Sequence, residues 1–280
     1  MAKKNKIQEK ELNYNIILSD IKWSYSSVAS YVKCPKCFYL QYIKCMKSSG
    51  GFFGEYGSFM HTILEKYAKK EMEVFELSKY YKDNFNTMVI NPAPPNKFVN
   101  LKEKYFKLGL DFFDNFEGYD NLNIVGVENK YDFKIGEYDF TGLIDLETTK
   151  DIIDYKTKGE LHIKKLTKKH NKEDYIQLDD GRYINFEDII QLLLYCIPYR
   201  TKHNKYPENI ILDMIKINDR YIIKFKEELL IRAIEWVNNV IGEIYEAKHF
   251  EVNKDLGEFW CNFVCSSRYN CSNSQRFIEE

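Results

Sequence analysis

Two acidic residues and a lysine interrupt the apolar runs of the segment Gly142–Lys158, "GLIDLETTKDIIDYKTK". Asp145 and Asp154 each lie within a run that otherwise reads as strand core, and Lys156 follows two positions after Asp154. Burying an unpaired carboxylate is expensive, so these positions require a chemical reason. If the intervening Thr-Lys pair forms a hairpin turn, Asp145 and Asp154 lie directly opposite each other. Lys156 then shares the face of Asp154.

Opposed carboxylates repel each other unless a positive charge lies between them. Lys156 supplies part of that charge, and a divalent cation with oxygen ligands supplies more; so few carboxylates suit Mg²⁺ or Mn²⁺. Such a metal polarises a phosphoryl oxygen and activates a water, while the lysine neutralises developing negative charge. This is the chemistry of phosphodiester hydrolysis. A structural ion pair between Lys156 and one aspartate is the alternative on these three residues alone.

Strand and helix signals surround this segment on both sides. Alternating apolar residues predict strands over 123–127, 130–135, 138–147 and 151–157, and a further pair over 210–217 and 220–225. The hairpin face away from the aspartates carries a core layer of Ile144, Leu146, Ile153 and Tyr155. Helical periodicity predicts helices over 24–40, 57–77, 97–116, 186–199 and 227–247. We expect Ser24 or Ser26 to cap the first, Pro198 to end the fourth, and Asp180-Gly181 to form a tight hairpin turn.

The bulk properties indicate one domain without an overall basic field. The chain has 280 residues, 44% of them hydrophobic, and a net charge of −1. That is enough for a single domain over 21–280 after a flexible tail over 1–20, and nucleic acid would have to be bound by local patches. No apolar run approaches the ~20 residues of a membrane helix. We expect a reducing cytoplasm, bacterial or phage-infected, where the seven cysteines are metal ligands or buried thiols.

Five motifs, in the same order, resemble those of the PD-(D/E)xK nucleases and their RecB/AddB-like exonuclease branch. The hairpin resembles the superfamily's metal-ion motif, in which an Asp ends one strand and an acid-x-Lys sits on the next. "SYSSVASYVKCPKCFYLQYI" resembles the branch's opening helix with its Cys-Pro pair. "GSFMHTILE" and "QLLLY" resemble its Gly-x-x-x-His helix and its Gln-x-x-x-Tyr motif. "WCNFVCSSRYNC" resembles its C-terminal iron–sulfur cysteine triplet.

The resemblance implies roles for individual residues. The implied metal ligands are His61, Asp145, Asp154 and the backbone carbonyl of Tyr155. The implied catalytic residues are Asp145, Asp154, Lys156, Gln191 and Tyr195. Glu128 matches an acidic position that some members carry before the motif. Without the resemblance, His61 would read as a structural histidine, and Gln191 and Tyr195 as ordinary residues on one helix face.

Three cysteines near the C-terminus have the spacing C-x3-C-x5-C, one residue longer than the C-x2-C-x5-C of the branch: Cys261, Cys265 and Cys271. The resemblance implies that they bind a 4Fe–4S cluster with Cys34 as the distant fourth ligand. Four thiolates suit zinc equally well by spacing. Cys37 is the alternative N-terminal ligand, because residues three apart on a helix are neighbours. Cys45 and Cys196 are expected to be small, buried apolar residues.

Together these observations predict an α/β fold with a restriction-endonuclease-like mixed β-sheet core flanked by helices. A helical insertion at about 68–116 and a cluster-binding tail at about 258–272, which acts as an iron–sulfur staple, complete it. We expect a Mg²⁺- or Mn²⁺-dependent DNA exonuclease in recombination, repair or phage DNA processing, with DNA and a helicase or single-strand annealing protein as partners. The alternative is a non-catalytic DNA-binding iron–sulfur subunit of a recombination or repair complex. A zinc-stapled protein without a nucleic-acid role is a third possibility.

Overall fold

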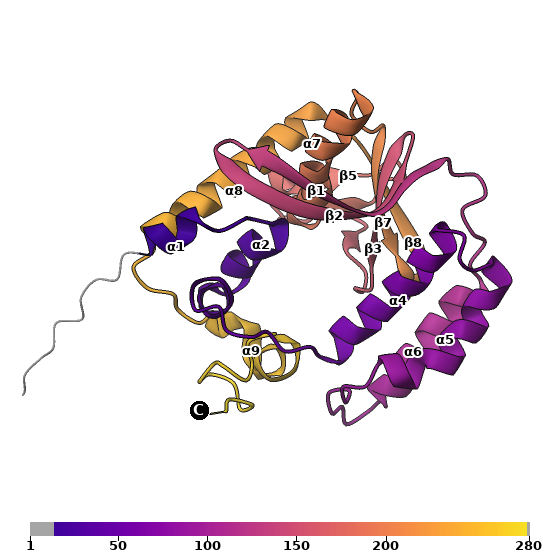
Figure 1. The fold of residues 1–280 in the computed structure, drawn as a ribbon, viewed down its shortest axis with the longest axis horizontal. Helices are drawn as coiled ribbons and strands as arrows, with labels where there is room; N and C mark the ends of the chain where they lie inside the picture. Colours follow the sequence, from indigo (N-terminus) through magenta and orange to yellow (C-terminus); the bar gives the residue numbers. More distant parts are fainter. Residues whose placement is uncertain (1–13, 279–280) are drawn as a thin grey trace, which may run out of the picture.

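A five-stranded mixed β-sheet forms the centre of the molecule in the computed structural model, which describes residues 14–278. The strand order is β1-β2-β3-β7-β8 (Figure 1). The strands are β1 (Ile124–Ile135), β2 (Tyr138–Thr148), β3 (Asp151–Lys156), β7 (Asn209–Met214) and β8 (Asp219–Lys224). Neighbours are antiparallel except β3 and β7, which are parallel and therefore need a crossover connection. This arrangement confirms the predicted mixed sheet of an α/β fold.

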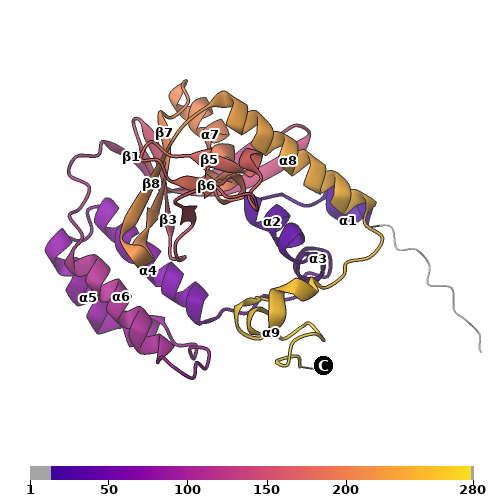
Figure 2. The same ribbon diagram turned by 180° about the vertical axis from the view of Figure 1, so that it is seen from behind.

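Helices cover both faces of this sheet (Figures 1 and 2). One side carries α7 (Ile190–His203) and α8 (Glu227–Glu246), and the other carries α4 (Phe52–Ala68), α5 (Val74–Met88) and α6 (Leu101–Asp114). Ile152 of β3 packs in the core with α7 and α8, whereas Ile153 packs in the core with α4, α5 and α6. Successive strand side chains point to opposite faces, so this central strand contributes to both cores.

The hairpin of β2 and β3 has the predicted turn and register. Leu146 pairs with Ile153 and Glu147 with Ile152, on either side of a turn at residues 149 and 150. The hydroxyl of Thr148 closes this turn by accepting hydrogen bonds from the backbone N–H groups of residues 150 and 151, at 3.1 and 2.8 Å. A threonine at the strand end therefore compensates for a Thr-Lys pair that is not a favoured turn sequence.

The ladder between these two strands ends at Leu146, so Asp145 and Asp154 are not a backbone-paired couple. The Tyr155 N–H donates to Asp145 Oδ2 at 2.8 Å instead of to a backbone carbonyl. Ile144 packs in the core with α7, not in the core that contains Leu146, so the predicted core layer is wrong at Ile144. Residues two apart on a regular strand share a face, so β2 departs from regular alternation between Ile144 and Leu146. Asp145 lies at this point, where the ladder between β2 and β3 ends.

The predicted helix over 24–40 is interrupted. Its start is as predicted, because Ser24 forms a capping box with Ser27 before α2 (Tyr25–Lys33). The helix breaks at Cys34, whose extended backbone (φ −161°, ψ 103°) precedes Pro35, since a residue before proline disfavours the helical region. The short helix α3 (Pro35–Phe38) and a π-helical turn (Tyr39–Ile43) follow. Cys34 therefore lies between two helices rather than inside one.

The predicted helix over 57–77 is two helices, because α4 ends at Ala68 and α5 begins at Val74. Lys70 has a left-handed backbone (φ 61°) in the intervening turn. Helix α5 then packs against α4 through Tyr81 and Phe59, whose rings stack with centroids 5.5 Å apart. Helix α6 returns after the proline-containing loop, as the sequence predicts. These helices form the lobe below the sheet in Figure 1.

A second, three-stranded sheet follows β3, with the order β4-β6-β5. Its strands are β4 (His162–Ile163), β5 (Tyr175–Gln177) and β6 (Tyr183–Asn185). Gly181 takes a positive φ of 85° in the predicted tight turn. Helix α7 begins at Ile190, later than predicted, and does not end at Pro198: it continues to His203 and is capped by left-handed Asn204. A proline removes one helical hydrogen bond, and the packing of buried Tyr195 and Tyr199 keeps the helix intact around it.

The N-terminal helices and the C-terminal segment of the described chain contact each other. Asn15–Ser19 forms the short helix α1 with Leu18 buried, so packing begins before residue 21; the rest of the predicted tail, residues 1–13, lies outside the described residues. The C-terminal segment contains α9 (Gly257–Phe259) and a π-helical turn (Trp260–Val264). Gln41 Nε2 donates to Ser266 Oγ at 2.5 Å across this junction. Within residues 14–278, no helix has the length and apolar character needed to span a bilayer.

A candidate metal centre and its catalytic side chains

Glu128 and Asp145 lie opposite each other on β1 and β2. The pairs Val127–Leu146 and Asn129–Ile144 flank them in the strand register. Glu128 has a left-handed backbone (φ 50°), an uncommon conformation for a residue with a side chain. This local distortion lies where β2 parts from β3, so both carboxylates are presented at an opening in the sheet.

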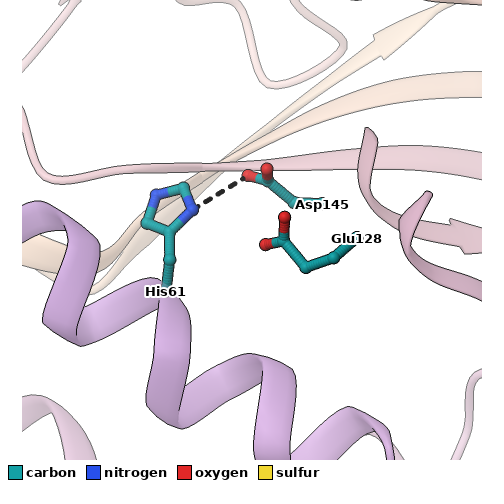
Figure 3. Close-up of side chains that lie close together, drawn as sticks. All are labelled: His61, Glu128 and Asp145. Atoms are coloured by element: carbon teal, nitrogen blue, oxygen red, sulfur yellow. Dashed lines mark ion pairs between the residues drawn. The ribbon is translucent and has the colours of Figure 1, made fainter. Parts of the chain in front are cut away.

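Helix α4 places His61 beside these two carboxylates. In Figure 3 its imidazole points from the helix towards Asp145, and Glu128 lies next to them. His61 Nδ1 is 3.5 Å from Asp145 Oδ2, and Nε2 is 3.0 Å from the carbonyl oxygen of Tyr155. One ligand atom from each of His61, Glu128 and Asp145 lies within 4.8 Å of the other two. The structure thus brings together two predicted ligands and the acidic residue matched from the resemblance.

Helix α4 can approach this closely because Gly57 has no side chain. A Cβ atom at Gly57 would lie 3.2 Å from the hydroxyl oxygen of Thr157, which follows β3. Gly57 is four residues before His61 and therefore on the same helix face. The glycine of the sequence motif allows the contact that the histidine then uses.

Charges around this group favour a bound cation. Burial raises the pKa of Asp145 well above its ordinary value, and the charge of Asp154 raises it further. Burial and neighbouring Glu65 raise the pKa of Glu128 to about 7. Burial lowers the pKa of His61, so its imidazole is neutral at pH 7 and keeps a lone pair for a metal. A divalent cation would offset the carboxylate repulsion, so these donors fit Mg²⁺ or Mn²⁺.

Asp154 lies beside this group and is paired with Lys156. Lys156 Nζ is 2.6 Å from Asp154 Oδ2, with 18% and 5% of the two side chains exposed. That carboxylate oxygen accepts no hydrogen bond from the described residues, so the contact is an ion pair without hydrogen-bond geometry. The structure therefore contains both features that the sequence suggested as alternatives: an ion pair between Lys156 and Asp154, and a group of carboxylates that could bind a metal. The charge of Asp154 raises the pKa of Asp145, so this carboxylate is close to the group of possible ligands, as its predicted role as a metal ligand requires.

Lys156 is held from its other side by α7. Its Nζ donates to Gln191 Oε1 at 2.9 Å, and Gln191 Nε2 donates to the Tyr195 hydroxyl at 2.9 Å. Burial opposes the charge of Lys156, but the close contact with Asp154 and the negative charges of Asp154 and Asp145 together outweigh it and raise the lysine's pKa. Lys156 is therefore a fixed cation. The predicted Gln-x-x-x-Tyr pair reaches the site through this lysine.

Gly142 supports Tyr195, and the sequence interpretation missed it. A Cβ atom at Gly142 would lie 2.5 Å from Cε1 of the Tyr195 ring, so the ring rests directly on the backbone of β2. Gly142 begins the motif segment, and a glycine inside a strand often marks a close approach by another group. The glycine in the strand was visible in the sequence, but the sequence did not show that the group approaching it is the ring of Tyr195.

Tyr155 connects the site to a buried polar network on the other face of β3. Its hydroxyl is 2.8 Å from the hydroxyl of Tyr119, and both side chains are buried. Asp213, on the neighbouring strand β7, is held by Arg220 at 2.6 Å. Burial raises the pKa of both tyrosines, and the charge of Asp213 raises each further. These contacts hold Tyr155, whose N–H and carbonyl face Asp145 and His61.

Five cysteines gather where the two ends of the chain meet. Cys34, Cys37, Cys265 and Cys271 are buried and Cys261 is partly exposed. Cys37 Sγ is 3.1 Å from Cys265 Sγ. A hydrogen bond from Cys37 lowers the pKa of Cys34 to about 6 and also lowers that of Cys265. The structure thus brings together the predicted four cysteines and the alternative Cys37.

The two remaining cysteines differ from each other. Cys196 lies on α7 and is buried in the core, as predicted for a small apolar residue. Cys45 is exposed and has a left-handed backbone (φ 50°), so the prediction that it is buried is wrong. It follows the π-helical turn, where the chain leaves the core, a position that its own sequence neighbourhood does not reveal.

Comparison with known proteins gives the class of protein that this fold and site define. The family model of the PD-(D/E)XK nuclease superfamily matches residues 22–272. The chain belongs to the PD-(D/E)XK nuclease superfamily, a class of nucleases that use divalent metals.

A solved structure agrees with this fold. The protein from Eubacterium rectale named "Putative exonuclease" is similar to this chain with a TM-score of 0.51 and 10% sequence identity. The similarity covers 100% of this chain and 96% of that chain, and at such low identity it concerns the fold. No curated protein matches the chain.

Proposed function

We propose that this protein is a metal-dependent DNA exonuclease of the RecB/AddB-like branch of its superfamily. The observation that carries the proposal is the gathering of His61, Glu128 and Asp145 next to the Lys156–Asp154 pair. A non-catalytic DNA-binding subunit, the alternative function, has no use for buried carboxylates placed against one another, since they cost stability without a cation.

Five groups would hold the catalytic metal: the His61, Glu128, Asp145 and Asp154 side chains and the carbonyl of Tyr155. A bound Mg²⁺ or Mn²⁺ polarises a phosphoryl oxygen and lowers the pKa of a water. The chain's own contribution is to keep the donors in place. Asp145 does so by accepting the Tyr155 N–H, and His61 by its contact with the carbonyl of the same residue.

Besides the metal, Lys156 supplies a positive charge that belongs to the protein itself. It lies between Asp154 and Gln191, so its ammonium group has little freedom to turn away. A fixed cation is worth most where negative charge develops on a phosphate, because no reorganisation is needed at the moment of reaction. Tyr195 orients Gln191 by accepting its hydrogen bond, and it borders the site on the side of α7.

DNA and an exonucleolytic mode are supported by likeness rather than by geometry. The motifs from Ser24 to Cys271 resemble an exonuclease branch, and the protein of similar fold from Eubacterium rectale is named "Putative exonuclease". A helicase or a single-strand annealing protein is the partner class that fits an enzyme working from DNA ends.

The test is digestion of DNA labelled at either end, single- or double-stranded, beside a covalently closed circle. We expect linear DNA to be degraded with Mg²⁺ or Mn²⁺, the circle to persist, and Lys156→Ala to be inactive while folded. The exposed control Asp83→Asn should match wild type. Cleavage of the circle at the rate of linear DNA would refute the exonucleolytic mode. Cleavage without added metal and in the presence of a chelator would refute the dependence on metal.

We also propose that Cys34, Cys261, Cys265 and Cys271 bind a 4Fe–4S cluster. Their thiol donors fit either an iron–sulfur cluster or a structural zinc ion. The resemblance of the C-terminal cysteine segment to the iron–sulfur triplet of the RecB/AddB-like branch is what favours the cluster over zinc. Anaerobically purified protein should be brown, with about four irons per chain.

A further inference from the structure

The N-terminal side of the cysteine group contains two thiols rather than one. Cys34 and Cys37 are 2% and 5% exposed, and both pack with Cys265 against Val252 and Trp260. They come from the "CPKC" segment, in which Cys34 precedes the short helix α3 and Cys37 lies within it. The resemblance accounts for Cys34 alone, so the position of Cys37 is unexplained by the proposed ligand set.

Cys37 lies between two of the four proposed ligands. Its Sγ is 3.1 Å from Cys265 Sγ, and its thiol also forms a hydrogen bond with the side chain of Cys34. Cys34 packs in the same buried cluster as Cys37 and Cys265. Either sulfur can thus reach the space that faces the C-terminal cysteines, and they are separated by less than one helical turn.

We infer that Cys34 and Cys37 share the N-terminal ligand position of the metal centre, so that either thiol alone completes the set with Cys261, Cys265 and Cys271. This inference rests on the proposed cluster-binding function. Apart from the proposed ligands Cys265 and Cys271, no cysteine is near Cys261 in the sequence, so its position has no such reserve. The chain therefore carries a spare thiol on one side of the centre, and losing one N-terminal cysteine leaves the two ends joined.

The experiment measures iron and sulfide per chain after anaerobic reconstitution with ferrous iron and sulfide, together with the melting temperature. We expect Cys34→Ala and Cys37→Ala to keep most of the iron of wild type. The double variant should lose it, as should Cys261→Ala, and both should melt lower than the single variants. Cys196→Ala, a buried thiol outside the group, is the matched control and should keep its iron.

Each other outcome has a distinct meaning. Loss of iron in Cys34→Ala but not in Cys37→Ala makes Cys34 the sole ligand and overturns the inference, and the converse makes Cys37 the sole ligand. Iron retained in the double variant removes both from the ligand set. If the double variant does not fold, loss in Cys261→Ala beside retention in the two single variants still supports sharing. Wild-type protein that binds no iron refutes the cluster itself and leaves the nuclease proposal standing.

Discussion

At the scale of single residues, Asp145 has two tasks that a different side chain can separate. It accepts the Tyr155 N–H that the interrupted ladder leaves over, and it places a charge beside Glu128 and His61. The first task needs an oxygen and the second needs a carboxylate. The hydrogen bond from the Tyr155 N–H therefore offsets part of the cost of burying this carboxyl beside other acidic groups.

Asp145→Asn keeps an oxygen for the Tyr155 N–H and removes the charge. We expect activity to fall by about 10²–10³-fold, the usual loss for one electrostatic contact in an active site. In metal-free buffer the melting temperature should rise, because like charges no longer face each other, and the rise that Mg²⁺ causes in wild type should disappear. A lower metal-free melting temperature would show that Asp145 is mainly structural; exposed Asp139→Asn is the control.

Gly142→Ala tests the support of Tyr195. The added Cβ would lie 2.5 Å from the tyrosine ring, so the ring must move and take its hydrogen bond with Gln191 along. We expect kcat to fall by about 10²-fold, as displacements near 1 Å can cause, with circular dichroism unchanged. Gly242→Ala is the matched control, because a Cβ there meets nothing within 4 Å. Unchanged kcat in Gly142→Ala would remove Tyr195 from the positioning of Lys156.

At the scale of elements, helix α7 holds the β2–β3 hairpin along one face. Residues 191, 195, 199 and 203 are four apart and so share that face. The Tyr199 hydroxyl donates to the Thr148 carbonyl at 3.0 Å, and His203 Nε2 is 3.2 Å from the Glu147 carboxylate. The end of α7 away from Gln191 is thus tied to the same strand that carries Asp145.

Glu147→Ala should weaken this attachment. The carboxylate is fully buried and contacts Tyr131, Asn129, Lys202 and His203. Removing one partner of a buried ionic group leaves the others unsatisfied, so we expect the free energy of unfolding to fall by about 3–5 kcal/mol in urea titrations. Glu147→Gln should lose less, since it keeps an acceptor for Tyr131. Exposed Glu137→Ala is the control, and an equal effect there would contradict the buried network.

At the scale of the whole molecule, the C-terminal segment fastens the linker between the opening helices and α4. Ser49 N donates to the Ser266 carbonyl at 2.8 Å, and Asn270 Nδ2 donates to the Lys47 carbonyl at 3.0 Å. Arg268 is 5% exposed and donates to carbonyls of both segments, those of Ser49, Gly50 and Cys265. The linker leads directly into α4, so this junction also supports the helix that carries His61.

Arg268→Ala should loosen both segments together. Three carbonyls, of which that of Cys265 is in a buried contact, would lose a charged donor, and we expect a loss of about 1–3 kcal/mol in the free energy of unfolding. Limited proteolysis followed by mass spectrometry should find new cleavage within both 44–51 and 258–278, with the sheet intact. Cleavage in one segment only would contradict the junction. Arg276→Ala, at an exposed arginine of the same segment, should digest like wild type.

Much of the sheet and part of the site were predictable from the sequence. Alternation and a short turn are local properties, so the sequence predicts the hairpin and, if the Thr-Lys pair forms its turn, the register that pairs Leu146 with Ile153. The N-cap at Ser24 and the tight turn at Gly181 were predictable for the same reason. Helix ends were less so, because packing around Pro198 outweighed the hydrogen bond that proline removes.

Only the tertiary structure decided how the chemistry is assembled. Glu128 lies near His61 and Asp145 because its backbone is left-handed and because β2 separates from β3 beyond Leu146. Neither feature can be read from the sequence around Glu128. Tyr195 lies on Gly142, which is more than fifty residues earlier in the chain. The sequence by itself determined which groups the protein has and, except where a strand departs from regular alternation as at Ile144, which face each occupies on its own element. Their distances depend on how separate elements pack, since a metal-sized group of donors forms only where helix α4 and the opened sheet meet.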